Sequence, residues 1–143
     1  WGEGLKSALR SKPRYIMVGE IRTPDTASEV LRAATSGHLV LSTIHANNIT
    51  DAINSVVKYA SSTSMSEELA YDLFSRGMLG VLHQTLNGVE RKIQLVSYLF
   101  ANPDSTKGDQ VRGIIKTGKL NLATSIETQM TRMARGKNIF PDL

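Results

Sequence analysis

Apolar side chains change their spacing along the first third of the chain, from helical to strand-like. In residues 3–14 they recur three to four positions apart, which predicts a helix that ends at Pro13. Two uninterrupted apolar runs, 15–18 and 38–44, predict strands buried on both faces, as parallel strands are when helices cover them. The segment 23–37 between them has helical spacing. Together these segments predict a parallel β-α-β unit, which typically takes about 30 residues.

The helix predicted over 23–37 carries signals at both ends. Thr23 can cap the first turn, Pro24 suits the first helical position, and Asp25 favours the positive end of the helix dipole. Gly37 suits the position just past the last turn, where the backbone often becomes left-handed. The residues at its two ends therefore mark the limits of this helix between the two strands.

The second half of the chain predicts more helices and one hairpin. Helices are expected at 49–60, 66–86, 109–118 and, in whole or in part, 121–136. Thr50 is the expected cap of the first of these helices. Asn87 and Gly88 form a strong hairpin-turn signal that leads into a strand over 92–100. The fold class indicated by the whole pattern is α/β.

Composition places the chain among ordinary globular proteins. It has 143 residues, of which 41% are hydrophobic and 21% charged, so residues 1–143 can form one domain with a core. The absence of cysteine excludes disulfides and thiolate metal sites. No apolar run approaches the roughly 18 residues that a membrane span needs. Because the chain begins at Trp1 and not at Met, we expect it to be a piece of a longer protein.

The net charge of +4 lies entirely in the last quarter of the chain. Residues 1–106 carry ten basic and ten acidic side chains, whereas residues 107–143 carry seven basic and three acidic ones. A basic segment can bind nucleic acid or acidic lipid, but only Phe140 is available here to stack on a base. We therefore favour solvated helix faces or a subunit interface. Nucleic-acid binding through 107–137 remains an alternative.

Reactive side chains follow both predicted strands. Glu20 and Arg22 come directly after the first strand. Thr43 and His45 lie at the end of the second. Because ligands of parallel α/β sheets bind beyond the carboxyl ends of the strands, these side chains are expected to converge on one crevice. A carboxylate that orients water and donors that bind phosphate charge suit phosphoryl transfer, which we favour over the interpretation of Glu20 and His45 as solvated strand ends.

The stretch ALRSKPRYIMVGEIRTPDTASEVLRAATSGHLVLSTIHANN, residues 8–48, resembles the central signature of the secretion ATPase superfamily. That superfamily includes the motors of type II secretion, type IV pili and type IV secretion. Its pattern is an apolar strand, G-E-x-R-D, E-T-A, T-G-H and a strand that closes in S-T-x-H-x-N. A weaker resemblance continues in the same order through 75–86, 111–120 and 125–130. The resemblance implies a RecA-like parallel sheet with flanking helices, here a partial domain with an added hairpin and C-terminal helices.

The resemblance also implies roles for individual residues. Glu20 falls on the Walker B glutamate, which polarises the attacking water and supports magnesium through water, and Gly19 stands where ordinary P-loop enzymes place an aspartate. Arg22 matches the family arginine, a partner for a carboxylate or a phosphate. His38 and His45 fall on the two histidines of the His box. Of these, His45 is the favoured γ-phosphate sensor, and His38 is favoured as a structural residue or a subunit contact. No residue is expected to bind a metal directly.

Two departures from the family pattern limit what this chain can do alone. Thr23 replaces the aspartate that usually follows the arginine, which exchanges a charged cap for a neutral one. No G-x-x-x-x-G-K-[ST] loop is present, so no backbone cradle or lysine holds the phosphates of ATP. We therefore expect the isolated segment to be inactive. Its 15–48 part would carry the Walker B and His-box residues, and 66–143 the helical and hairpin part.

For the full-length protein the resemblance implies ATP and Mg²⁺ as ligands. It also implies a homo-oligomer, expected to be a hexamer, that works at the cytoplasmic face of a bacterial inner membrane with a platform protein of a pilus or secretion machine. Two alternatives stay open beside this motor ATPase. The first is a non-catalytic interaction module that packs into a ring, and the second is the nucleic-acid-binding domain considered above.

Overall fold

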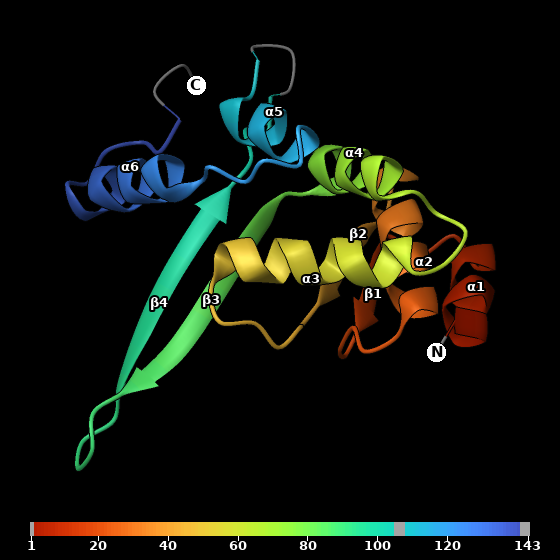
Figure 1. Cartoon of the computed structure of the whole chain (residues 1–143), viewed down its shortest axis with the longest axis horizontal. Helices are drawn as coiled ribbons and strands as arrows, with labels where there is room; N and C mark the ends of the chain where they lie inside the picture. Colours follow the sequence, from red (N-terminus) through yellow and green to blue (C-terminus); the bar gives the residue numbers. More distant parts are fainter. Residues whose placement is uncertain (1, 105–107, 141–143) are drawn as a thin grey trace.

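The computed structural model describes residues 2–104 and 108–140 (Figure 1). In chain order the elements are α1 (Gly2–Arg10), β1 (Tyr15–Val18), α2 (Pro24–Thr35), β2 (Leu39–Ser42), α3 (Ile49–Ser61), α4 (Glu67–Gly77), β3 (Gly80–Asn87), β4 (Ile93–Phe100), α5 (Gln110–Lys116) and α6 (Ala123–Ala134). Helices α1 to α4 gather around β1 and β2, and β3 and β4 form a long hairpin that runs out from the helices (Figure 1).

The predicted β-α-β unit is confirmed. β1 and β2 pair in parallel with Tyr15 opposite Leu39, and α2 connects them. The Thr23 hydroxyl accepts a hydrogen bond from the Thr26 amide at 3.3 Å, so Thr23 caps α2 as expected. Gly37 has φ +86°, the left-handed conformation that glycine adopts most easily. The crossover therefore sets the carboxyl ends of β1 and β2 side by side.

The prediction that both strands are buried on both faces is wrong. Ile16 and Val18 are buried and pack with residues of α1 and α2, but Tyr15 and Met17 between them are 69% and 82% exposed. Leu41 of β2 is also exposed. Within the described residues the parallel sheet has two strands and helices cover one of its faces. An uninterrupted apolar run shows that both faces of a strand can be buried. The packing of the other elements decides which face is covered.

Helix α3 matches the helix predicted over 49–60, but its cap differs. Asn48 is the capping residue, since its side-chain oxygen accepts a hydrogen bond from the Asp51 amide at 2.8 Å. The Asp51 carboxylate in turn accepts from the Asn47 amide at 2.8 Å. Thr50, the expected cap, lies inside the first turn. The reciprocal pair of bonds resembles a capping box and places the cap two residues before Thr50.

The long helix predicted over 66–86 is wrong in its second half, which is strand β3. Two glycines accompany the change. A Cβ at Gly77 would lie 3.0 Å from the Ala34 Cβ, so the end of α4 packs closely on α2. A Cβ at Gly80 would lie 2.5 Å from the Phe100 ring, so only glycine fits beneath that ring where β3 begins. Apolar residues in this segment suit both spacings, and the pairing with β4 selects the strand.

The predicted hairpin is confirmed, with a longer turn than the two-residue signal indicates. The antiparallel ladder of β3 and β4 ends where Asn87 lies opposite Ile93, so residues 88–92 form the turn. Gly88 has φ +107°, and a Cβ at this position would collide with the carbonyl of Arg91. Figure 1 shows the tip of this hairpin well away from every helix.

Two apolar clusters form the core of the described residues. The first combines α1, β1, α2, α3 and α4. The second combines α3, β4 and α5, and its members with less than 2% exposure are Ile49, Ile53, Leu99, Ile115 and Leu122. Tyr71 and Phe74 of α4 pack against both clusters. Helix α4 therefore connects the parallel sheet to the hairpin region.

Helix α6 confirms that most of 121–136 is helical. It is attached to β4 by Gln129, whose side-chain amide donates to the Phe100 carbonyl and accepts from the Phe100 amide, both at 2.8 Å. Gln129 is buried, so these bonds satisfy a polar group that would otherwise be costly. Among the described residues, every helix is too short or too polar to cross a membrane.

Candidate active site

The carboxylate of Glu20 lies just past the carboxyl end of β1. The Ile21 amide donates to the Thr43 carbonyl at 2.8 Å, so the chain after β1 stays beside the chain after β2. Arg22 contacts one oxygen of Glu20 with two nitrogens: Nε donates to Oε2 at 2.6 Å, and Nη2 lies 2.6 Å from the same oxygen. The second oxygen, Oε1, is not engaged by Arg22. One half of the carboxylate is therefore held in place and the other half faces the site.

His45 approaches the other half of that carboxylate. Its Nε2 atom lies 3.4 Å from Glu20 Oε1. The His45 side chain is 95% exposed, whereas Glu20 is 22% exposed. The structure thus brings together Glu20, Arg22 and His45, three of the side chains that the sequence predicted to share one crevice. The imidazole extends from the loop between β2 and α3 into open space, where a ligand could reach it.

Thr43 and Gly19 connect the ends of the two strands. The Thr43 hydroxyl donates to the Gly19 carbonyl at 2.5 Å. This bond uses the hydroxyl hydrogen within the protein, so Thr43 holds the backbone at Gly19, the residue before Glu20. A Cβ at Gly19 would meet no atom within 4 Å, so the described residues contain no steric reason for glycine at this position.

His38 lies at the opposite end of the strands. It precedes β2, and its Nδ1 atom is 2.8 Å from the Pro13 carbonyl, just before β1. Because a carbonyl only accepts, Nδ1 carries the hydrogen in this contact. The structure therefore separates the two predicted His-box residues, with His45 beside Glu20 and His38 holding the amino ends of β1 and β2 together.

The contact with Arg22 sets the charge state of Glu20. The hydrogen bond from Arg22 holds the pKa of the Glu20 carboxyl below its ordinary value, and the charges of Arg22 and His45 lower it further. Partial desolvation opposes this shift. The same pairing raises the pKa of the Arg22 guanidinium. Glu20 is therefore ionised at neutral pH, which is the state that a water-activating base requires.

One residue of this region was missed by sequence reasoning. His83, which falls within the helix predicted over 66–86, lies in β3. Its Nε2 atom is 3.0 Å from the carbonyl of Ala46, the residue after His45. The signal that could have located it is the hairpin turn at Asn87 and Gly88, because a strand must precede such a turn.

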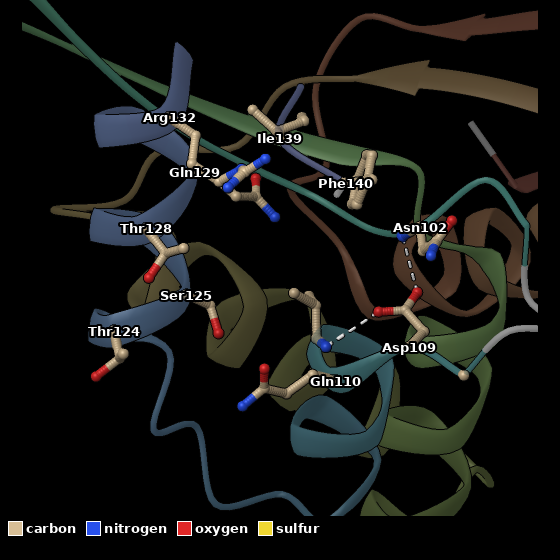
Figure 2. A pocket seen from close by; sticks show the side chains of 12 residues that line it. Asn102, Asp109, Gln110, Thr124, Ser125, Thr128, Gln129, Arg132, Ile139 and Phe140 are labelled. Carbon is tan, nitrogen blue, oxygen red and sulfur yellow. Dashed lines mark hydrogen bonds between the residues drawn. The ribbon is translucent and has the colours of Figure 1, made fainter. Parts of the chain in front are cut away.

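A separate polar cavity of about 570 Å³ lies between α5, α6 and residues 139–140 (Figure 2). Figure 2 shows Thr124, Ser125 and Thr128 of α6 along one side and Asp109 near the other. The Asp109 carboxylate already accepts from the Asn102 and Val111 amides, at 2.9 and 3.0 Å. None of the residues predicted for the active site lines this cavity. It is distinct from the cluster of Glu20, Arg22 and His45.

Within residues 2–104 and 108–140, no three His, Asp or Glu side chains are grouped closely enough to hold a metal ion. The cluster of Glu20, Arg22 and His45 offers one carboxylate oxygen not bound by Arg22 and one exposed imidazole. Such a pair can orient water and contact a phosphate, but it cannot by itself enclose a nucleotide.

The model of the family described as "Type II/IV secretion system protein" matches residues 1–111. The chain belongs to this family. Of the secretion-system proteins it is similar to, type II secretion system protein E of Pseudomonas aeruginosa is 41% identical over 86 residues, which are 60% of this chain and 16% of that protein. A twitching motility protein of Neisseria gonorrhoeae is 27% identical over 99% of this chain and 40% of its own length.

A solved structure of the pilus retraction motor PilT with bound ADP has the same fold. It superposes with a TM-score of 0.66 at 27% identity, over 96% of this chain and 36% of the motor. The expected family and the expected RecA-like α/β fold are thereby confirmed. This secretion-system chain spans less than half the length of the relatives described here.

Proposed function

We propose that the chain is part of a motor ATPase that hydrolyses ATP to drive protein secretion or pilus movement. The observation that carries this proposal is the placement of Glu20, with Oε2 held by Arg22 and Oε1 facing His45. PilT, which shares the fold, binds ADP and is a pilus retraction motor. Family membership makes the same chemistry the first candidate for this chain.

Each predicted residue has a role that its contacts allow. Oε1 of Glu20 accepts a hydrogen from the attacking water, and Arg22 keeps the carboxylate ionised and oriented. His45, exposed beside Glu20, donates to the terminal phosphate. Thr43 and Gly19 keep the two strand ends together.

The residues at Glu20 could contact magnesium only through a water molecule, and ATP only through its phosphates. Mg²⁺, when bound with ATP, neutralises charge on the phosphates. Glu20 Oε1 is free to hold one water of its shell, and this is the fit that the residues present allow. Residues 1–143 carry no phosphate-cradling loop, so we propose that this loop comes from another part of the protein.

We further propose that residues 1–143 are one partial ATPase domain, with 15–48 carrying the site and 66–143 the helical and hairpin part. Two parallel strands alone make an unusually small sheet, and each described strand has one unpaired edge. Additional strands from the same protein would pair with those edges. The proposed assembly is a hexamer at the cytoplasmic face of the bacterial inner membrane, against a platform protein of the pilus or secretion machine.

The proposal is tested by ATP turnover of the full-length protein that contains this chain. Glu20→Gln keeps the shape of the side chain and removes its charge, and we expect kcat to fall by about 100-fold or more. Glu68→Gln is the matched control, since Glu68 is an exposed carboxylate on α4. Turnover that survives Glu20→Gln would contradict the role of Glu20 and would support the non-catalytic ring module. The isolated 143-residue segment is expected to show no turnover.

A further inference from the structure

We propose that His83, on the hairpin, is a positioning residue that fixes the loop carrying His45; this rests on the proposed function. The Nε2 atom of His83 lies 3.0 Å from the carbonyl oxygen of Ala46. A backbone carbonyl only accepts hydrogen bonds, so Nε2 carries the hydrogen and donates. The contact joins two residues separated by 37 positions, one in the loop after β2 and the other in β3.

The loop between β2 and α3 has backbone hydrogen bonds near both ends. The bond from His83 adds a contact in its middle. At one end, the Thr43 carbonyl accepts from the Ile21 amide. At the other end, the Asn47 amide donates a hydrogen bond to the Asp51 carboxylate in the first turn of α3. Between these ends stands His45, whose own side chain is 95% exposed. The bond from His83 holds the carbonyl of Ala46, the residue that directly follows His45.

The hairpin provides a rigid base for this bond. In β3, His83 shares a face with Val81, which lies opposite Leu99 of β4. Leu99 is completely buried in the second core cluster. The residue before His83, Leu82, points to the other face and is 60% exposed. His83 therefore lies close to the buried base of the hairpin and ahead of its exposed outer half.

The end of the loop borders an open cavity beside the hairpin. Asn47 and Asn48 line an open cavity of about 660 Å³ together with Ser97, the cross-strand partner of His83. The loop is therefore not packed tightly against β4 at this point. Removing one donor from His83 leaves the Ala46 carbonyl without that partner and lets the loop shift. A shift of about 1 Å at a catalytic group can cost as much as 100-fold in rate.

The first experiment measures ATP turnover by the full-length protein. His83→Phe keeps an aromatic ring and removes the donor, and we expect kcat to fall on the order of tenfold with KM for ATP changed less than about twofold. His83→Gln restores an N–H at similar reach and should return kcat to within about threefold of the parent. Gln84→Ala, the neighbouring residue on the opposite face of β3, is the matched control and should leave kcat unchanged.

The second experiment measures the protection of the loop backbone from hydrogen exchange and does not depend on catalysis. Amide hydrogen exchange of residues 43–48 should become about fivefold faster in His83→Phe, as expected for the loss of one hydrogen bond, and should be unchanged in Gln84→Ala. His83→Val, which suits a strand and also lacks the donor, gives the same result if the aromatic variant folds poorly.

The outcomes separate the two proposals. Parent-like kcat in both donor-less variants overturns the positioning role, even where Glu20→Gln is inactive and the ATPase proposal stands. Unchanged exchange over 43–48 in both variants overturns the anchoring of the loop. Absence of ATP turnover in the parent protein overturns the proposed function, and the exchange measurement then decides alone whether His83 holds the loop.

Discussion

At the scale of single residues, the two oxygens of the Glu20 carboxylate have different partners. Arg22 takes Oε2 with two nitrogens and leaves Oε1 to face His45. Arg22 is largely exposed, so this ion pair adds little to the free energy of unfolding. Its value lies in orienting the Glu20 carboxylate and keeping it charged.

The pH dependence of ATP turnover should report this pairing. The pKa of folded Glu20 lies below its ordinary value, so the proposed base stays ionised as the pH falls toward that value. Arg22→Gln removes the main cause of the shift, and the Glu20 pKa should rise. We therefore expect the acid limb of the kcat/KM profile to move to higher pH. Arg32→Gln, an exposed arginine of α2, is the control and should not move that limb.

An acid limb that stays in place in Arg22→Gln would mean that a group other than Glu20 is the base.

The pairing of Glu20 with Arg22 also affects the stability of the fold in a defined direction. A carboxyl group whose folded pKa is lowered stabilises the fold above its unfolded pKa and loses this contribution as the pH falls through the folded pKa. For an exposed pair this effect is small, so activity is the more sensitive measurement.

At the scale of elements, the ends of helices place the loop that carries His45. The first turn of α3 is held by Asn48 and Asp51, and His45 stands three residues before Asn48. The strand ends are held by the Thr43 hydroxyl on the other side. The loop is therefore short and attached at both ends, which limits how far the imidazole can move from Glu20.

Substitution of the helix cap tests this arrangement. Asn48→Ala removes the acceptor of the Asp51 amide and should destabilise the first turn of α3 by about 1 kcal/mol. Thr50→Ala is the control, since Thr50 lies within the turn and is not its cap, and its effect should stay within about 0.5 kcal/mol. Amide hydrogen exchange in α3 measures both. A larger effect at Thr50 than at Asn48 would contradict the observed cap.

At the scale of the whole molecule, α4 and α5 connect the two apolar clusters through Arg112. Its Nη1 atom donates to the Ser75 and Arg76 carbonyls, at 2.8 and 3.0 Å, at the end of α4. Its Nε atom lies 2.8 Å from an Asp109 carboxylate oxygen, close enough for an ion pair but not aligned as a hydrogen bond. Arg112 is 17% exposed and Asp109 7%, so water screens this pair poorly.

Breaking this connection should destabilise the fold far more than breaking a surface pair. Arg112→Met removes the donors and leaves the Asp109 carboxylate without its charged partner, and we expect a loss of about 2–3 kcal/mol. Arg76→Met removes the exposed partner of Asp72 and is the matched control, with an expected loss below about 0.5 kcal/mol. Thermal unfolding compares the two, and equal Tm values for both variants would contradict the connecting role of Arg112.

The amino-acid sequence by itself determined the β-α-β unit and the placement of Glu20 and His45 after neighbouring strands. Thr23 and Gly37 mark the ends of α2 through local chemistry, since a hydroxyl cap and a left-handed glycine act within a few residues. The meeting of Glu20 and His45 also follows from sequence, because the carboxyl ends of neighbouring parallel strands lie at one edge of a sheet.

Only the tertiary structure decided the features that depend on distant partners. The segment 66–86 is compatible with helix and strand, and its second half becomes β3 because it pairs with β4 and because Gly80 fits beneath Phe100. The exposure of Tyr15 depends on which face of the sheet the helices cover. His83 reaches the loop of His45 only after the hairpin has folded against α3, since a hydrogen bond across 37 residues leaves no local pattern in the sequence.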